Sequence, residues 1–175
     1  MDIFVINTSD ADNVKPELLE EFRYKEFSNL AKKKEHCFAY LMLDRIIKEV
    51  YKIENRKIEF LNNKPYLKNR EKFFSLCHSG EYLVIGFSDN ECGVDIEKIK
   101  PRDYKAISER MNFGSNTLED FYKDWTKYEA EYKLGTKAES IIQTNIENYI
   151  LTSVSCNTQE KFEIYIQNGE TFPNL

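Results

Sequence analysis

The sequence predicts an α+β fold, because strand-like and helix-like segments are mixed along the chain without strict alternation. Short apolar runs have strand length, and two longer segments carry apolar residues at helical spacing. With 175 residues, 41% hydrophobic and 14% aromatic, the chain can bury a real core. Its formal net charge of -5 disfavours a nonspecific nucleic-acid binder, so an anionic ligand must meet a local basic patch.

The first part of the chain is expected to begin with a strand, followed by two helical segments and three further strands. The strands are expected at 2–7, 56–61, 72–79 and 82–88, and the helical segments at 16–22 and 32–53. In the longer helical segment, Phe38, Leu41, Ile46 and Val50 fall near one stripe, which indicates a face packed on the core. The residues NNKP (62–65) are a turn signal.

The second part is expected to begin with a strand and end with two. The strands are expected at 93–97, 147–156 and 161–168, and helices at 102–111 and 117–134. Asn116 with Glu119 resembles a capping box at the start of the longer helix, and Gly135 is a typical residue after a helix end.

Several classes of protein are disfavoured by what the sequence lacks. The first residues have neither the basic segment nor the long apolar core of a signal peptide, and no run approaches the roughly 18 apolar residues of a membrane span. The four cysteines are scattered without a CxxC pair, which favours reduced thiols in a cytoplasm over disulfides, and the His–Cys neighbours lack zinc spacing.

The strand GVDIE places two acids where a buried strand is expected. Asp95 and Glu97 share one face of an extended chain, while Val94 and Ile96 share the other. Two like charges on a half-buried strand cost free energy unless something positive lies between them. A metal ion, a lysine and solvent are the three candidates.

The helix at 117–134 carries Trp125, Glu129 and Lys133 four residues apart, hence on one face. Taken alone, this pattern is typical of a solvated ion pair beside a core tryptophan. If the helix packs against the acidic strand, three carboxylates and a lysine converge. Hard oxygen ligands suit magnesium, which bridges to phosphate oxygens, and lysine complements phosphate as a point charge.

Four blocks of sequence in order resemble the 4'-phosphopantetheinyl transferases of the surfactin-synthetase-activating type. The blocks are NKPYL (63–67), FSLCHSGEYLVIGFS (74–88), GVDIEKIKPR (93–102) and DFYKDWTKYEAEYK (120–133). The resemblance implies transfer of the phosphopantetheine arm of coenzyme A to a serine of an acyl or peptidyl carrier protein, with release of adenosine 3',5'-bisphosphate.

The resemblance also implies roles for individual residues. Asp95, Glu97 and Glu129 would hold Mg²⁺ against the pyrophosphate of coenzyme A. Glu129 would deprotonate the carrier serine, directly or through a metal-bound water. Lys133 would neutralise charge that builds on the pyrophosphate as the bond breaks. These roles agree with what phosphoryl-type transfer needs, namely positioning, a metal and a nearby cation.

Other residues would bind the nucleotide. The resemblance implies that His78, with Ser79 beside it, contacts the 3'-phosphate end and that Lys64 lines the nucleotide pocket. Relatives also place basic residues before the first long helix. Here the candidates are Arg23, Lys25 and the run Lys32–Lys34, although a solvated charge run also explains the last of these.

The architecture implied by the resemblance is two similar α+β halves fused in one chain with pseudo-twofold symmetry. The halves would be residues 1–78 and 79–175, with the coenzyme in the cleft between them. Asp95 and Glu129 would come from the second half, and His78 from near the junction. A fused chain of this kind favours a monomer. The scattered cysteines, the acidic net charge and the lack of a long apolar run favour a cytoplasmic protein that binds neither nucleic acid nor membrane.

The sequence departs from the family pattern at Tyr128, which stands where relatives have lysine. Lys127 is no substitute, because a shift of one residue turns a side chain by about 100° on a helix. None of the expected metal ligands is lost, so an active enzyme is predicted. Two alternatives stay open: a coenzyme A-binding or carrier-docking module without turnover, and a magnesium-dependent nuclease.

Overall fold

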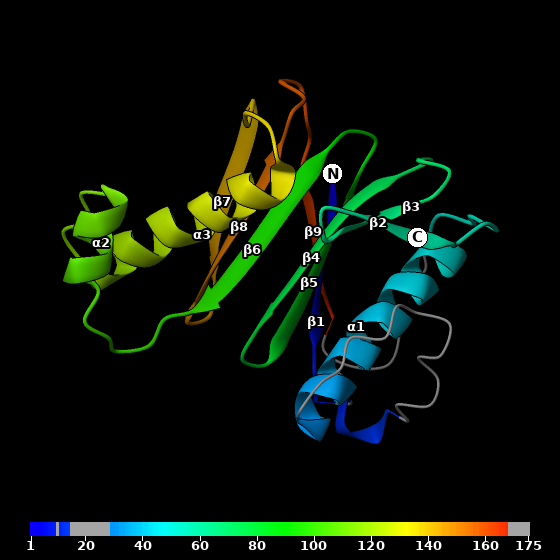
Figure 1. The fold of residues 1–175 in the computed structure, drawn as a ribbon, viewed down its shortest axis with the longest axis horizontal. Coiled ribbons are helices and arrows are strands. Elements are labelled where there is room, and N and C mark those ends of the chain that lie inside the picture. The colour runs from blue at the N-terminus through cyan, green and yellow to red at the C-terminus, as the bar shows by residue number, and fades with distance from the viewer. Residues whose placement is uncertain (10, 15–28, 168–175) are drawn as a thin grey trace.

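The computed structural model describes residues 1–9, 11–14 and 29–167, and within them the chain forms a mixed α/β fold with strands between two long helices (Figure 1). The helices are η1 (Ala11–Asn13), α1 (Leu30–Glu49), α2 (Lys105–Met111) and α3 (Leu118–Leu134). The strands are β1 (Asp2–Asn7), β2 (Ile58–Leu61), β3 (Lys64–Leu67), β4 (Phe73–Ser79), β5 (Tyr82–Ser88), β6 (Cys92–Lys98), β7 (Ser140–Ile146), β8 (Tyr149–Ser155) and β9 (Glu163–Gln167).

Most of the expected elements are confirmed. The expected strands correspond to β1, β2, β4, β5, β6, β8 and β9, and the long helices to α1 and α3. The helical segment expected at 16–22 lies outside the described residues. The first long helix was expected to continue to residue 53, but α1 ends at Glu49, and Lys52 has a left-handed backbone with φ of 55°.

Two strands were not expected. β3 follows directly on a tight turn in which Asn62 and Asn63 both have positive φ, 50° and 66°, as the commonest two-residue hairpins require. It contains Pro65, which argues against a strand except at a sheet edge, and β2 and β3 form a two-stranded hairpin that is all edge. β7 lies at the edge of its sheet and is only half-buried along one side.

The N-terminal sheet is assembled from distant parts of the chain in the order β4-β5-β1-β9. β1 pairs antiparallel with β5 and parallel with β9, so both ends of the described chain meet in one sheet. One face of this sheet packs against α1 in a core that includes Phe4, Leu43, Ile46 and Phe87. The predicted division between residues 78 and 79 falls inside β4, before its last residue, and it stays a prediction.

The C-terminal sheet has the order β6-β8-β7 and lies between the N-terminal sheet and α3. Val94 of β6 packs with Ile3 and Val84 of the N-terminal sheet, while Ile150 and Val154 of β8 belong to clusters built on α3. The two long helices therefore cover opposite sides of the strands, as Figure 1 shows.

The start of α3 is capped one residue later than expected. Thr117 Oγ1 accepts a hydrogen bond from Asp120 N at 3.0 Å, and Asp120 Oδ2 accepts one from Thr117 N at 3.1 Å. The prediction of Asn116 with Glu119 was therefore wrong, because Thr117 and Asp120 satisfy both backbone donors reciprocally. The expected end is confirmed, since Gly135 follows α3 in a left-handed conformation with φ of 76°.

α3 approaches β6 closely because residue 93 is glycine. A Cβ on Gly93 would lie 2.0 Å from the Ala130 carbonyl oxygen and 2.9 Å from Leu134 N, so only glycine allows this contact. A second contact fixes the helix along its length, where the hydroxyl oxygens of Thr126 on α3 and Thr152 on β8 lie 2.8 Å apart, both fully buried.

The four cysteines, all of which the structure describes, form no disulfides, and Cys37, Cys77 and Cys92 are buried. None of the helices that the structure describes is both long and apolar enough to cross a membrane. Cytoplasmic location stays a prediction.

Gly93→Ala is predicted to destabilise the protein by about 3 kcal/mol, since the added methyl group meets helix backbone that cannot rotate away. Chemical denaturation measures this change in the free energy of unfolding. Gly114→Ala is the control, because no atom lies within 4 Å of the Cβ position there and only the positive φ of 72° is strained. Equal losses in the two variants would contradict the close approach of α3 to β6.

Candidate active site

A lysine supplies positive charge beside one of the two acids of β6. Lys133 Nζ donates hydrogen bonds to Asp95 Oδ1 at 2.6 Å and to the Val94 carbonyl oxygen at 3.0 Å. Gly93, Asp95 and Glu97 share the face of β6 that α3 covers, so the glycine contact is what brings Lys133 to the strand. The lysine-bearing helix packs on the acidic strand, which was the condition for their side chains to approach each other.

Asp95 is only 6% exposed, and burial raises its pKa to about 6. The Lys133 ammonium opposes this shift, while the charges of Glu97 and Glu129 add to it. Burial disfavours the charged form of Lys133, yet its pKa is raised, because Cys77, Asp95 and Glu129 favour the ammonium. One cation and three carboxylates therefore interact electrostatically in this region.

The second carboxylate oxygen of Asp95 is buried, and it has no hydrogen-bond partner among the residues that the structure describes. A buried carboxylate oxygen without a partner is costly, and such an atom in a native structure calls for an explanation. Hard oxygen donors from Asp95, Glu97 and Glu129 are the donor set that magnesium prefers. The chemistry of these residues and the orphaned oxygen fit a divalent cation.

As they stand, these side chains do not surround a common point. Within residues 1–9, 11–14 and 29–167, no three His, Cys, Asp or Glu side chains are grouped so that they could hold a metal ion. In this arrangement the Lys133 ammonium takes the position beside Asp95 that a cation would use. The joint ligand role of Asp95, Glu97 and Glu129 stays a prediction.

Two serines of β4, of which Ser75 was not singled out from the sequence, connect that strand to β6. Ser75 Oγ accepts a hydrogen bond from Val94 N, and Ser79 Oγ accepts one from Lys98 N, both at 3.1 Å. Ser79 Oγ also donates to Glu97 Oε2 at 2.9 Å, which orients one of the three carboxylates. His78 is exposed on the same strand. The contacts of His78 and Ser79 with coenzyme A stay predictions.

A cavity of about 780 Å³ lies between the β2–β3 hairpin, β4 and the C-terminal end of α3. Its lining includes both Lys64 and Lys133, which are 69 positions apart in the sequence, together with Arg70 and Glu91. The volume is in the range of small-molecule sites. Sequence reasoning did not single out Arg70 or Glu91, which stand in or beside turns and belong to none of the family blocks.

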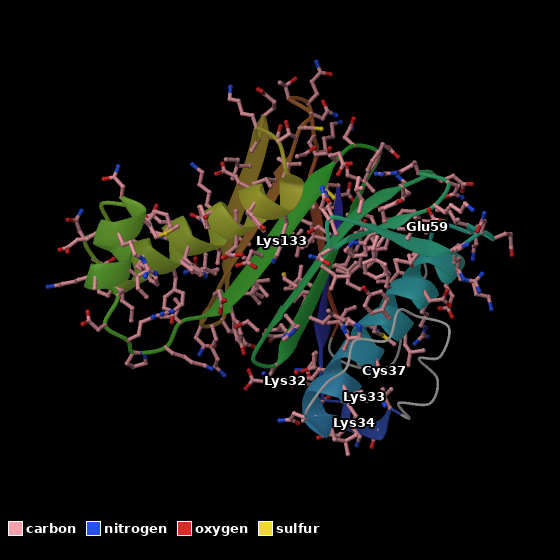
Figure 2. The ribbon with its side chains drawn as sticks, viewed as in Figure 1. Lys32, Lys33, Lys34, Cys37, Glu59 and Lys133 are labelled. Carbon is pink, nitrogen blue, oxygen red and sulfur yellow. The ribbon has the colours of Figure 1, made fainter. Side chains whose placement is uncertain are left out.

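The basic run at the start of α1 does not belong to this site. Figure 2 shows Lys32, Lys33 and Lys34 near the N-terminal end of α1, whereas Lys133 lies between α3 and the strands. Lys34 Nζ donates to the carbonyl oxygen of Asp12 at 2.6 Å, which ties the helix to η1. Arg23 and Lys25 lie outside the described residues.

Tyr128, which stands where relatives have lysine, is part of an aromatic group on α3. Its ring centre lies 6.0 Å from that of Phe113 and 6.3 Å from that of Trp125, and the residue is 41% exposed. Trp125 in turn stacks on Phe121 at 6.0 Å. The position of the family lysine is therefore filled by aromatic packing between α3 and the segment that follows α2.

A mixed α/β fold in which a lysine pairs with a buried carboxylate and lines a cavity is compatible with the phosphopantetheinyl transferases. Comparison with curated proteins finds the 4'-phosphopantetheinyl transferase psf-1 of Bacillus pumilus, 34% identical over 116 residues. The alignment covers 57% of this chain and 49% of the relative, so the chain spans about half the length of the curated relative it matches. No family model matches the chain. The resemblance of the sequence to the 4'-phosphopantetheinyl transferase superfamily is confirmed.

The raised pKa of Asp95 predicts that its ionisation weakens the fold. Because the folded-state pKa is about 6 and the ordinary value is 3.8, the contribution of Asp95 is fully present below pH 4 and is lost as the pH rises towards 6. Relative to Asp95→Asn, the wild-type protein should lose about 2–3 kcal/mol of unfolding free energy across this window. Denaturant titrations at a series of pH values measure the difference.

Asp120→Asn is the control for this experiment. The hydrogen bond from Thr117 lowers the pKa of Asp120, so the contribution of Asp120 to the free energy of unfolding changes with pH in the opposite direction. Parallel pH profiles for wild type and Asp95→Asn would show that burial does not shift the Asp95 pKa.

Proposed function

We propose that this protein transfers the 4'-phosphopantetheine arm of coenzyme A to a serine of an acyl or peptidyl carrier protein. The observation that carries the proposal is the position of Lys133, whose ammonium lies on Asp95 while its side chain lines the cavity that also contains Lys64. A cation that pairs with a buried carboxylate and lines a ligand cavity suits the transfer of a charged phosphoryl-type group. The similarity to a phosphopantetheinyl transferase supports the same reaction.

In the proposed reaction, the serine oxygen bonds to the phosphorus that carries the pantetheine arm. The bond from that phosphorus to the bridging oxygen of the pyrophosphate breaks, and adenosine 3',5'-bisphosphate leaves with that oxygen. Glu129 accepts the serine proton, directly or through a water. Lys133 neutralises negative charge on the leaving phosphate, which requires that it release Asp95.

Asp95, Glu97 and Glu129 are the residues that would hold magnesium in this site. When bound, the ion would supply positive charge to the pyrophosphate oxygens and lower the pKa of a bound water. Asp95 is suited to this role because its buried Oδ2 has no hydrogen-bond partner. Glu97 is oriented by the hydrogen bond from Ser79, which makes Ser79 a positioning residue for the ligand set.

Coenzyme A would occupy the cavity of about 780 Å³, with its nucleotide towards Lys64. His78 and Ser79 would lie at the 3'-phosphate end. Two similar halves with pseudo-twofold symmetry, residues 1–78 and 79–175, would enclose the coenzyme in a cytoplasmic monomer. The support for this architecture is that each of the two larger sheets has one long helix on its outer side.

A second candidate function is a coenzyme A-binding or carrier-docking module without turnover. Tyr128 favours this alternative, because the position of the family lysine holds an aromatic ring packed on Phe113. Such a module would bind coenzyme A and leave the carrier unmodified.

Incubation with coenzyme A, magnesium and a panel of apo carrier proteins is predicted to add the mass of the phosphopantetheine arm to a carrier serine. Intact-protein mass spectrometry measures the gain, and a carrier with that serine replaced by alanine is the control. Stabilisation of the protein by coenzyme A with no modified carrier would favour the binding module. Cleavage of added DNA with no modified carrier would favour the nuclease.

Glu129→Gln is predicted to lower the transfer rate about 10²–10⁴-fold, the usual contribution of a general base, while coenzyme A still binds. Calorimetry measures the binding, and mass spectrometry measures the rate. Glu131→Gln is the matched control, because it removes the same charge about 200° round α3. A Glu129→Gln variant as active as the control would remove Glu129 from the mechanism.

A further inference from the structure

One end of the cavity contains two cations that share a single carboxylate. Lys64 Nζ lies 2.7 Å from Glu91 Oε2, and Arg70 Nη1 lies 3.4 Å from Glu91 Oε1. All three side chains line the cavity and are between 34% and 40% exposed. One negative charge between two positive ones leaves a net positive charge facing the cavity.

The guanidinium of Arg70 is held in place by aromatic rings. It lies 4.0 Å above the ring centre of Tyr66 and 5.8 Å from that of Phe73. Ring contacts of this kind orient the plane of the group without using its five N–H donors, which are more than one carboxylate oxygen can accept. Arg70 is therefore presented to the cavity in an orientation suited to a planar fork of donors, which matches phosphate or carboxylate.

The backbone of Glu91 is held by a hydrogen bond, and its side chain lines the cavity. It stands in the turn between β5 and β6, where its carbonyl oxygen accepts a hydrogen bond from Cys156 N at 3.2 Å. The carboxylate makes half-exposed ion pairs, and such pairs are weak because solvent screens them. An anion with more charge than a carboxylate can displace it from both cations.

We propose that Glu91 is a built-in counter-ion that competes with a phosphate group of the ligand for Lys64 and Arg70. The inference rests on the proposed function, since coenzyme A supplies phosphate at two places, the 3'-phosphate and the pyrophosphate. It assigns a binding role to Arg70 and makes Glu91 a determinant of affinity. Loss of Glu91 tightens the binding of the anion, and loss of Arg70 weakens it.

The first test measures binding of coenzyme A by calorimetry to Glu91→Gln. The substitution keeps the shape of the side chain and removes the competing charge, so affinity should rise about 5- to 10-fold, the change expected from exposed ion pairs of this kind. Glu71→Gln is the matched control, because Glu71 is an exposed acid of the nearby β3–β4 segment that accepts from Asn69. Equal affinity in Glu91→Gln and in the control would overturn the proposal.

The second test uses Arg70→Gln, which should weaken binding about 10-fold. Lys68→Gln is its control, since Lys68 is a neighbouring cation that pairs with Glu59 at 3.5 Å. Thermal denaturation of both variants separates lost stability from lost binding. An Arg70→Gln variant that is folded and binds coenzyme A like the control would overturn the role of Arg70.

Two further probes identify the phosphate. Adenosine 3',5'-bisphosphate lacks the pyrophosphate, and dephospho-coenzyme A lacks the 3'-phosphate. If Glu91→Gln tightens binding of the first probe but not of the second, the site takes the 3'-phosphate; if it tightens binding of the second, the site takes the pyrophosphate. Carrier modification is measured separately. Tighter binding of coenzyme A by Glu91→Gln without carrier modification supports the counter-ion role and refutes the transferase. Carrier modification with unchanged binding supports the transferase and refutes the counter-ion role.

Discussion

The contact between Lys133 and Asp95 is the interaction on which the rest of the site depends. It joins the last turn of α3 to the middle of β6, and it is possible only because Gly93 lets the helix backbone approach the strand. Because Asp95 is deeply buried, its charged form would be costly without this partner. The Lys133 side chain also lines the cavity, so one residue links the buried Asp95 to the space where a ligand would bind.

Side chains rather than a backbone ladder join β4 to β6. Ser75 and Ser79 accept hydrogen bonds from backbone N–H groups of β6, and these contacts connect the N-terminal sheet to the acidic strand. Buried backbone donors must find partners, and hydroxyl groups satisfy them here while leaving Ser79 able to hold Glu97. The arrangement places the acids of β6 at the boundary between the two sheets.

The elements that form the site could be predicted from the sequence. Alternation identified β6, helical spacing and Gly135 identified α3, and the four-residue spacing put Glu129 and Lys133 on one face. The contact between Lys133 and Asp95 could not be predicted from residue spacing alone, because spacing does not show that α3 packs on β6. Neither Arg70 nor Glu91 carried a signal, because they belong to separate turns that only the folded chain brings together.

Two differences between the predicted and the observed strands have causes in the local sequence. β3 was not predicted because it contains Pro65. Its hairpin tolerates proline because, among the described strands, β2 and β3 pair only with each other. β7 was missed because apolar and polar residues do not alternate along it: Ile141 lies on the exposed side, and Ser140 and Thr144 lie on the half-buried side. The resemblance to the transferases supplied the roles of His78, Ser79 and Lys64, which no pattern of spacing indicates.

The most direct test of the account is a crystal structure of the protein grown with coenzyme A and Mn²⁺, with anomalous scattering used to locate the metal. The account predicts a peak at ligand distance from Asp95, with Glu97 and Glu129 turned towards it and the Lys133 ammonium moved from the carboxylate to a phosphate oxygen. A metal bound elsewhere, with Lys133 still on Asp95 and coenzyme A outside the cavity, would contradict it.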